Sequence, residues 1–513
     1  MKGDKRMNDF DKYLLDNSIE VDPDKFYYNS PIYFNEERLF DCFNDILLNN
    51  RKVMIFGDCD LDGILSAYQV KEMFKSFSFS NYEVWNINNK NHNIDEDCIR
   101  RCIVDKFDYL IILDVGSNEM GKLEKLNVFG VKTIIIDHHV SNFSYDDYPS
   151  SCVIINTKMN NLVDTKYNYV LSAGALTFTL LYKYGAIKSK DLVHLSVCGL
   201  ITLYSDSVDM DTSLAKSIYS LAIKLGVSSL PYFVKDFLDK YSFRRRFIEF
   251  IFSPRINSLF RSERFDIINK YFFDDSVTSI QRRTLINKID EIYVNSRKLI
   301  ARVSDTVPRE ELDNFVLCNL SKSDLAINTN KLYNYTGIIA NNLADTYGKP
   351  CVVLCDTGDG IKGSFRDLFG RDYLSLFTQF CKCGGHPPAF GIHLKYGEVS
   401  DFLDTIKYTI DKRFYMYEIK ENLIVEMDDK YPSVRTLEKM ALYNEFAGIS
   451  LSPVVIKKRH FMKELASYSK TYYSYSWGEL KVDSNHKLVL GKDVYIKPII
   501  SSKLRLVTVN RVK

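Results

Sequence analysis

The heptapeptide GDCDLDG, residues 57–63, places three aspartates at alternate positions directly after an apolar run. The run, residues 53–56, is typical of a buried strand, and the residues after the heptapeptide are typical of an apolar helix. Carboxylates held together in such a turn repel one another unless cations lie between them. The motif predicts a divalent-metal site, and its alternative is a solvated acidic loop. An EF-hand fits poorly, because Gln69 stands at the twelfth position where that loop needs Glu. The three aspartates are Asp58, Asp60 and Asp62.

Two further polar clusters follow other apolar runs. Asp114 opens DVGSN after residues 109–113, and the triplet DHH comprises Asp137, His138 and His139. Adjacent imidazoles and a carboxylate suit manganese, iron or zinc better than calcium, although a surface histidine pair is the alternative. A fourth carboxylate follows a long apolar helix in LITLYSDSVDM. It is predicted to be Asp206, with Asp209 and Asp211 as open alternatives.

Short apolar runs must position these side chains. Such runs alternate with amphipathic stretches from residue 52 to about residue 175, which is typical of a parallel sheet flanked by helices. The carboxyl ends of parallel strands meet at one edge of a sheet, so we expect Asp58, Asp114 and Asp137 to converge there. The runs are residues 53–56, 83–87, 109–113, 133–136 and 152–155.

The length and composition limit the possible classes of protein. A chain of 513 residues is expected to form several domains, and 46% hydrophobic with 26% charged residues excludes wholesale disorder. The net charge of +2 means that a polyanion must be held by a local patch or by metal ions. Eleven cysteines without a C-x-x-C pair favour reduced thiols in the cytoplasm. A charged N-terminus and the absence of a long apolar run predict neither export nor a membrane span.

Taken in order, the four motifs resemble those of the DHH phosphoesterase superfamily. Three segments in the second half, GIIANNLADTYGKP, IKGSFR and CGGHPPAFG, are similar to the DHH-associated domain of RecJ-type single-strand nucleases. The resemblance covers roughly residues 51–392. It implies an α/β chain with a parallel-sheet DHH domain, a helical connector, a smaller α/β DHH-associated domain and a short β-rich, OB-like module. The expected boundaries are 1–50 for an N-terminal extension, 51–227 for the DHH domain, 228–310 for the connector, 311–412 for the DHH-associated domain and 413–513 for a helical segment with the β-rich module.

The resemblance also implies a metal centre and a substrate clamp. Two divalent ions, manganese before magnesium, would be held by Asp58, Asp60, Asp62, Asp114, His138 and Asp206. Asp114 would bridge the two ions, Asp137 would orient a histidine, and His139 would contact the scissile phosphate or the leaving group. The clamp residues would be Ser364, Arg366, Gly384, Gly385 and His386. Phe365 stands where relatives commonly have Gly, so we expect its bulk to narrow or reshape the clamp.

The remaining features favour a chain-like substrate. Residues 243–247, 281–285 and 296–302 interleave cations with aromatic or apolar residues, as a nucleic-acid groove would, although solvated helix faces are the alternative. The tail resembles the oligonucleotide-binding module of RecJ proteins. Its aromatic residues are Tyr472, Tyr473, Tyr475 and Trp477.

The function implied is that of a metal-dependent single-stranded-DNA exonuclease acting 5′ to 3′ in DNA repair, recombination or replication, with RNA left open as a substrate. A single-strand-binding protein or a helicase would be its partner. Two alternatives stay open. One is a phosphodiesterase of short oligonucleotides or cyclic dinucleotides, and the other is a non-catalytic, replication-associated relative.

Overall fold

The computed structural model divides the chain into two compact units. One comprises residues 1–286 and 422–512, and the other comprises residues 287–421 and 513. The predicted N-terminal extension lies mostly outside the described residues. The structure describes residues 33–90, 92–159, 171–186, 194–238, 241–320, 332–368, 371–386, 388–413, 423–426, 434–447, 453–459, 462–469, 472–477, 480–484, 487–489, 493–500 and 504–509.

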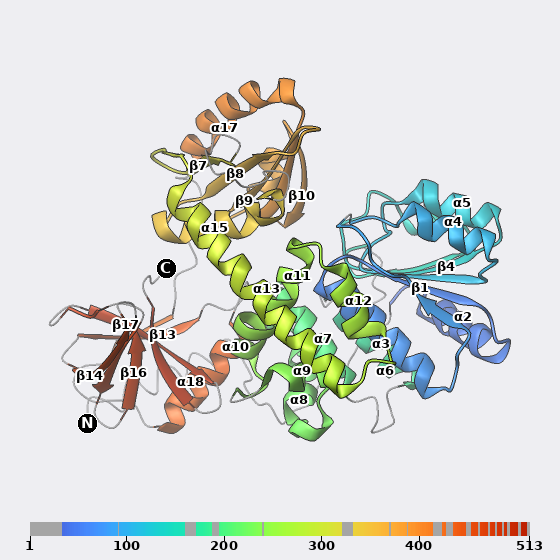
Figure 1. The fold of residues 1–513 in the computed structure, drawn as a ribbon, viewed down its shortest axis with the longest axis horizontal. Helices are drawn as coiled ribbons and strands as arrows, with labels where there is room; N and C mark the ends of the chain where they lie inside the picture. Colours follow the sequence, from blue (N-terminus) through green and yellow to red (C-terminus); the bar gives the residue numbers. More distant parts are fainter. Residues whose placement is uncertain are drawn as a thin grey trace. The chain divides into compact units, whose positions relative to one another are not determined.

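The first unit contains the predicted parallel sheet (Figure 1). Its strand order is β2-β1-β3-β4-β5, and every neighbouring pair is parallel. All residues of β1, β3 and β5 are buried, because helices cover both faces of the sheet. The expected α/β fold class is therefore confirmed. The strands are β1 (Val53–Gly57), β2 (Tyr82–Val84), β3 (Tyr109–Leu113), β4 (Lys132–Asp137) and β5 (Cys152–Asn156).

Helices on both sides fix this sheet. Figure 1 shows α4 and α5 on one face, where their apolar residues join the core formed by Met54, Leu110 and Ile135. Helices α3 and α6 pack against β1 and β4, and α7 packs against both α3 and α6. The helices are α2 (Glu36–Leu48), α3 (Leu61–Ser76), α4 (Glu96–Val104), α5 (Met120–Val128), α6 (Ala173–Tyr184) and α7 (Leu195–Ser205).

A helical region follows the sheet. Its core is aromatic, with Phe233, Phe247, Phe252 and Phe272 fully buried. The last helix, α13, continues past residue 286, where the first unit ends. The elements are α8 (Ser213–Lys224), η3 (Val227–Ser229), α9 (Tyr232–Leu238), α10 (Arg245–Phe247), the π-helix η4 (Ile248–Phe252), α11 (Ser253–Arg261), α12 (Phe265–Phe273) and α13 (Ser279–Thr306). Among the described helices, none is both long enough and apolar enough to span a bilayer.

A seven-stranded sheet completes the first unit and confirms the β-rich tail. Its order is β12-β13-β17-β18-β16-β15-β14, and α18 (Val434–Phe446) packs on β17. Tyr475 and Trp477 are core residues of this sheet, so their rings are not exposed for stacking on bases. The side chain of Tyr472 lies outside the described part. The strands are β12 (Leu423–Glu426), β13 (Val454–Arg459), β14 (Lys463–Ser469), β15 (Tyr472–Trp477), β16 (Leu480–Ser484), β17 (Asp493–Ile500) and β18 (Leu504–Val509).

The second unit is the smaller α/β domain. Its mixed sheet has the order β10-β11-β9-β8-β7-β6, in which only β7 and β8 are parallel. The strands are β6 (Arg309–Glu311), β7 (Val316–Asn319), β8 (Cys351–Asp356), β9 (Ile361–Arg366), β10 (Lys382–His386) and β11 (Ala389–Leu394). The helices are α15 (Thr336–Tyr347), α16 (Leu374–Phe377) and α17 (Val399–Arg413).

Phe365 does not narrow the clamp as expected. Side chains alternate along a strand, so Phe365 points to the face of β9 opposite Ser364 and Arg366. There it is fully buried in an apolar cluster and stacks on Phe390, with ring centroids 4.8 Å apart. The bulk of the phenyl ring therefore stabilises the domain core.

Candidate metal centre

The turn from β1 into α3 presents the first group of carboxylates. Asp60 is the N-cap of α3, and its Oδ1 accepts the backbone N–H groups of Asp62 at 2.9 Å and Gly63 at 3.1 Å. A Cβ on Gly63 would lie 2.3 Å from Asp58 N, and one on Gly57 would lie 2.4 Å from Gly63 O. Only glycine permits this approach, so the two glycines set the spacing of the three aspartates.

The register of β1, β3 and β4 brings Asp58, Asp114 and Asp137 to the same edge of the sheet. Gly57 pairs with Leu113, and Leu113 pairs with Ile136, so the next residue of each strand lies at the same edge. The ladder continues there, because Asp58 N donates to the carbonyl of Leu113 at 3.0 Å and Asp114 N to that of Ile136 at 2.9 Å. Asp114 adopts a left-handed conformation with φ of 66°, which turns the chain out of the sheet.

The buried imidazole of His138 lies among three of the predicted ligands. Its Nε2 is 3.2 Å from Asp114 Oδ1, 3.3 Å from Asp206 Oδ2 and 3.8 Å from Asp62 Oδ2. Asp206 reaches this position because it is the C-cap of α7. By contrast, Asp211 pairs with Lys216 at 2.6 Å, and Asp209 accepts the backbone N–H of Asp211. The structure thus brings Asp206 to the other ligands.

Without a cation, the buried carboxylates of this cluster repel one another and are unfavourable in their ionised form. Burial, followed by repulsion between neighbouring carboxylates, raises the pKa of Asp62 and Asp114 well above the ordinary value and that of Asp206 to about 6. Burial also raises the pKa of Asp58. Within the described part of the chain, no hydrogen bond reaches the buried oxygens Asp58 Oδ1, Asp114 Oδ1 and Asp206 Oδ2. Oxygen atoms without donors, beside an imidazole, fit one or more divalent metal ions.

Asp62 also has a structural task. Its Oδ2 accepts the N–H of Ala173 at 2.8 Å, and its Oδ1 accepts that of Gly174 at 2.7 Å. These groups belong to the first turn of α6, whose N–H groups have no partner within the helix. The carboxylate therefore fixes α6 against the metal centre, and each oxygen keeps a lone pair for an ion.

Asp137 orients the second histidine of the DHH triplet. Its Oδ1 accepts the N–H groups of His138 at 2.7 Å and His139 at 3.1 Å and lies 2.8 Å from His139 Nδ1. Its Oδ2 accepts Ser117 N at 3.2 Å. Burial would raise the pKa of Asp137, but the contacts with His139 and Ser117 outweigh it and hold that pKa well below the ordinary value. Asp137 is thus an ionised anchor, while the His139 ring is half-exposed beside the cluster.

Comparisons with known proteins find similar sequences and a similar fold. A model of the DHH family, N-terminal domain, matches residues 52–203, which carry all the predicted metal ligands except Asp206. RecJ of Bacillus subtilis, a single-stranded-DNA-specific exonuclease, is 22% identical over 447 residues, covering 83% of this chain and 54% of that protein. RecJ of Dickeya dadantii is 20% identical over 393 residues, covering 69% of this chain and 66% of that protein.

A solved structure extends the match over almost the whole chain. The structure of RecJ from Thermus thermophilus in complex with Mn²⁺ has a TM-score of 0.72 at 12% identity, covering 96% of this chain and 73% of that one. The chain thus contains a segment that matches the DHH family, and its fold is similar to that of RecJ. It spans about half the length of the Bacillus subtilis RecJ that it matches.

Two groups of residues in the DHH domain were not predicted from the sequence. Asn156, at the end of β5, donates through Nδ2 to Ser117 Oγ at 2.8 Å and to the carbonyl of His139 at 2.9 Å, so it supports the DHH loop. His92 Nδ1 lies 2.6 Å from Asp58 Oδ2, and Cys59 Sγ lies 3.9 Å from the same nitrogen. Asn156 could have been suspected from its position after a strand of this sheet, whereas no spacing signal marks His92.

The predicted clamp residues of this RecJ-like chain gather in the second unit. Ser364 Oγ lies 2.8 Å from Thr336 Oγ1, and the Arg366 guanidinium packs so closely on Gly337 that a Cβ there would lie 2.6 Å from it. Antiparallel pairing brings β9, β11 and β10 side by side. The structure thus holds Ser364 and Arg366 in one sheet with the following residues. These are Gly384, Gly385, whose φ is 138°, and His386, whose side chain lies outside the described part.

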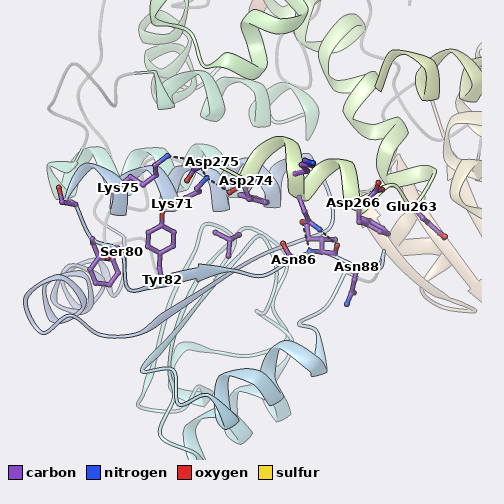
Figure 2. A pocket seen from close by; sticks show the side chains of 18 residues that line it. Lys71, Lys75, Ser80, Tyr82, Asn86, Asn88, Glu263, Asp266, Asp274 and Asp275 are labelled. Atoms are coloured by element: carbon purple, nitrogen blue, oxygen red, sulfur yellow. Dashed lines mark hydrogen bonds and ion pairs between the residues drawn. The ribbon is translucent and has the colours of Figure 1, made fainter. Parts of the chain in front are cut away.

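A large polar hollow of about 1280 Å³ lies between the edge strand β2 and α12 (Figure 2). Its charged lining consists of three lysines and four carboxylates, and Lys71 and Lys75 both contact Asp275, at 2.8 and 3.1 Å. None of the predicted metal ligands lines it. Such a paired surface attracts a polyanion poorly, so we assign the chemistry to the carboxylate cluster.

Proposed function

We propose that this chain is a metal-dependent phosphodiesterase that degrades single-stranded DNA from a strand end, in the 5′ to 3′ direction. The observation that supports the proposal most is the buried cluster around His138, where carboxylate oxygens from Asp58, Asp114 and Asp206 lack hydrogen-bond donors among the described residues. Such a donor set suits hard divalent cations, which phosphodiester hydrolysis needs to neutralise the charge on the reacting phosphate.

Two ions, with Mn²⁺ favoured and Mg²⁺ as the substitute, fit the number of donors. The imidazole among the carboxylates favours Mn²⁺ over Mg²⁺. When bound, such a pair lowers the pKa of a water molecule and stabilises charge on the transferring phosphoryl group. The proposed ligands are Asp58, Asp60, Asp62, Asp114, His138 and Asp206.

His139 would act on the substrate directly. Since Asp137 occupies its Nδ1, the ring is held with Nε2 available, and half of the side chain is open to solvent. Asp137 also raises the pKa of His139 against the opposing effect of burial, which favours a donor on the ring. We assign to His139 a hydrogen bond to the scissile phosphate or proton donation to the leaving oxygen, with Asp137 as its positioning residue.

The second unit would contribute substrate binding. Arg366 can form a bidentate pair with a phosphate, and backbone N–H groups near Gly384 and Gly385 permit close approach of an anion. Ser364 and His386 complete the proposed clamp. These residues would position the strand and leave the bond-breaking step to the first unit.

The names of the matched relatives support single-stranded DNA as the substrate, since the proteins from Bacillus subtilis and Dickeya dadantii are both called single-stranded-DNA-specific exonucleases. A cytoplasmic role in DNA repair, recombination or replication, beside a single-strand-binding protein or a helicase, is the biological setting that we propose.

The direct test is incubation of the full chain and Mn²⁺ with single strands labelled at the 5′ or the 3′ end. Progressive release of mononucleotides or short oligomers from the 5′ end is expected, with none from the Asp114→Asn variant. Parallel reactions with RNA, with two- to five-residue oligonucleotides and with cyclic dinucleotides separate the alternatives. Exclusive turnover of the short substrates would favour the small-substrate phosphodiesterase. No turnover of any substrate would favour the non-catalytic relative.

A further inference from the structure

A second set of donor atoms lies beside Asp58. Asp58 Oδ2 is 2.6 Å from His92 Nδ1, which is 3.9 Å from Cys59 Sγ. The three ligand atoms all lie within 4.8 Å of one another. A carboxylate, an imidazole and a thiol so close together are able to bind one ion.

The backbone around His92 is fixed on both sides. Ile87 donates its N–H to Asn269 Oδ1 at 3.1 Å, and its carbonyl accepts Asn269 Nδ2 at 2.7 Å. The amide side chain of Asn269, on α12, thus makes the two backbone hydrogen bonds that a neighbouring strand would otherwise make. After the loop, Lys122 Nζ donates to the carbonyl of Ile94 at 2.7 Å, and Ile94 is fully buried. The loop that carries His92 is therefore anchored at Ile87 and at Ile94.

The buried carboxylate of Asp58 belongs to both groups of donor atoms. Its side chain is 2% exposed, and its Oδ1 meets no hydrogen-bond donor among the described residues. The same carboxylate belongs to the all-oxygen group formed with Asp60 and Asp114. Asp58 is thus shared between a hard donor set, which suits Mn²⁺ or Mg²⁺, and a set that contains nitrogen and sulfur.

We propose that Asp58, Cys59 and His92 form a second site for zinc-type ions, such as Zn²⁺ or Co²⁺, which shares Asp58 with the predicted nuclease centre. One oxygen, one sulfur and one nitrogen are the donor types that zinc binds in tetrahedral sites, and three protein ligands leave a fourth position for water. Binding displaces the proton of the Cys59 thiol to solvent. The ion withdraws Asp58 from the all-oxygen group, so zinc inhibits hydrolysis. The site itself does not depend on the proposed function, and only the inhibition does.

Cobalt substitution in the full chain tests the site, because a thiolate bound to Co²⁺ gives a sulfur-to-metal charge-transfer absorption that oxygen and nitrogen ligands do not give. We expect this band in the unmodified protein and its loss in Cys59→Ser. His92→Ala is expected to weaken Co²⁺ and Zn²⁺ binding at this site at least tenfold. The matched controls are Cys42→Ser, a half-buried thiol of α2, and His393→Ala, an exposed histidine of β11, which should leave the band unchanged.

Three results would overturn the proposal: no sulfur band in the unmodified protein, a band that survives Cys59→Ser, or equal affinity in His92→Ala. Circular dichroism of each variant verifies that it is folded. If the band behaves as expected while no DNA is degraded, the proposed function fails and the zinc-type site stands. If DNA is degraded, we expect micromolar zinc to inhibit the unmodified protein more strongly than His92→Ala, and equal inhibition would contradict the shared role of Asp58.

Discussion

His139 Nδ1 lies 2.8 Å from Asp137 Oδ1, on the carboxylate that also accepts the backbone N–H groups of both histidines. Asp137→Asn keeps an oxygen acceptor but removes the charge that favours a protonated ring. We expect turnover to fall about 10- to 100-fold, as is usual for partners that orient a site residue, with unchanged metal content. Kinetics and elemental analysis check this, and loss of metal comparable to that of His138→Ala would show that Asp137 supports the ion instead.

Asp114 and Asp62 should differ in their effect on the stability of the metal-free protein. Asp114→Asn removes a charge from a repulsive cluster, and Asn tolerates the left-handed backbone, so the melting temperature should rise. Asp62→Ala leaves the N–H groups of Ala173 and Gly174 without an acceptor, and each unsatisfied group costs about 1–3 kcal/mol of folding stability. The melting temperature of this variant should therefore fall. Thermal unfolding in chelator measures both, and a shift in the same direction would refute the structural task of Asp62.

Glu445 should make stability depend on pH. It is buried, accepts the N–H of Arg245 at 3.2 Å and the hydroxyl of Tyr219 at 3.3 Å, and burial raises its pKa from 4.5 to about 7. Because the pKa of this carboxyl is higher in the folded than in the unfolded chain, its contribution to folding stability is fully present below pH 4.5. That contribution, about 3 kcal/mol, is lost as the pH rises from 4.5 through 7. Relative to the unmodified protein, Glu445→Gln should therefore gain stability between pH 5 and pH 8. Exposed Glu438→Gln, on the same helix, is the control, and urea titrations showing a constant offset would contradict the prediction.

Arg366 should affect substrate binding without affecting the metal. Losing a charge-assisted hydrogen bond to a phosphate costs about 1.5–3 kcal/mol, so Arg366→Ala should reduce kcat/KM about 10- to 150-fold. Arg366→Lys keeps the positive charge but loses the planar, two-donor guanidinium, so it should recover only part of the lost kcat/KM. Single-strand kinetics and metal analysis provide the test, and release of metal from Arg366→Ala would rule out the clamp.

The two neighbouring arginines at the start of α13 should behave differently. The Arg282 guanidinium lies 4.6 Å from the ring centroid of Tyr232, whereas Arg283 is exposed. If α13 contacts the DNA backbone, Arg283→Ala should lower the salt slope of long-strand binding by about one, with cleavage of dimers unchanged. Arg282→Ala should also lower the melting temperature, because a packed ring contact is lost. Equal salt slopes in both variants and the unmodified protein would place the DNA elsewhere.

The sequence predicted the parallel sheet because most of the apolar runs are short and continuous; the exception, residues 83–87, contains Glu83 and Asn86, and the strand there is Tyr82–Val84. Strands buried on two faces need such runs, and their carboxyl ends then have to share an edge, which is why Asp58 and Asp114 could be expected together. The convergence of His138 with Asp206 is harder to predict, since it depends on how α7 packs. The structure supplies that packing, but the metal-binding roles stay predictions.

The less accurate expectations concern local orientation. The family comparison gave Phe365 a place in the clamp, yet strand alternation directs it into the core. The tail was expected to resemble an oligonucleotide-binding module, and two of its four aromatic residues, Tyr475 and Trp477, are buried in the core of its sheet. His92 had no signal, because it lies 34 residues after Asp58 in a loop whose course depends on Asn269 of a distant helix.

The contact between Gly57 and Gly63 has a consequence for the variation of this chain over evolution. Two backbone segments touch there without any side chain between them, so a single inserted or deleted residue would separate Asp58 from Asp60 and Asp62. The heptapeptide from Gly57 to Gly63 is therefore constrained in length as well as in residue type. Among relatives, an altered length of this heptapeptide would mark the loss of the site more reliably than an exchange of one aspartate.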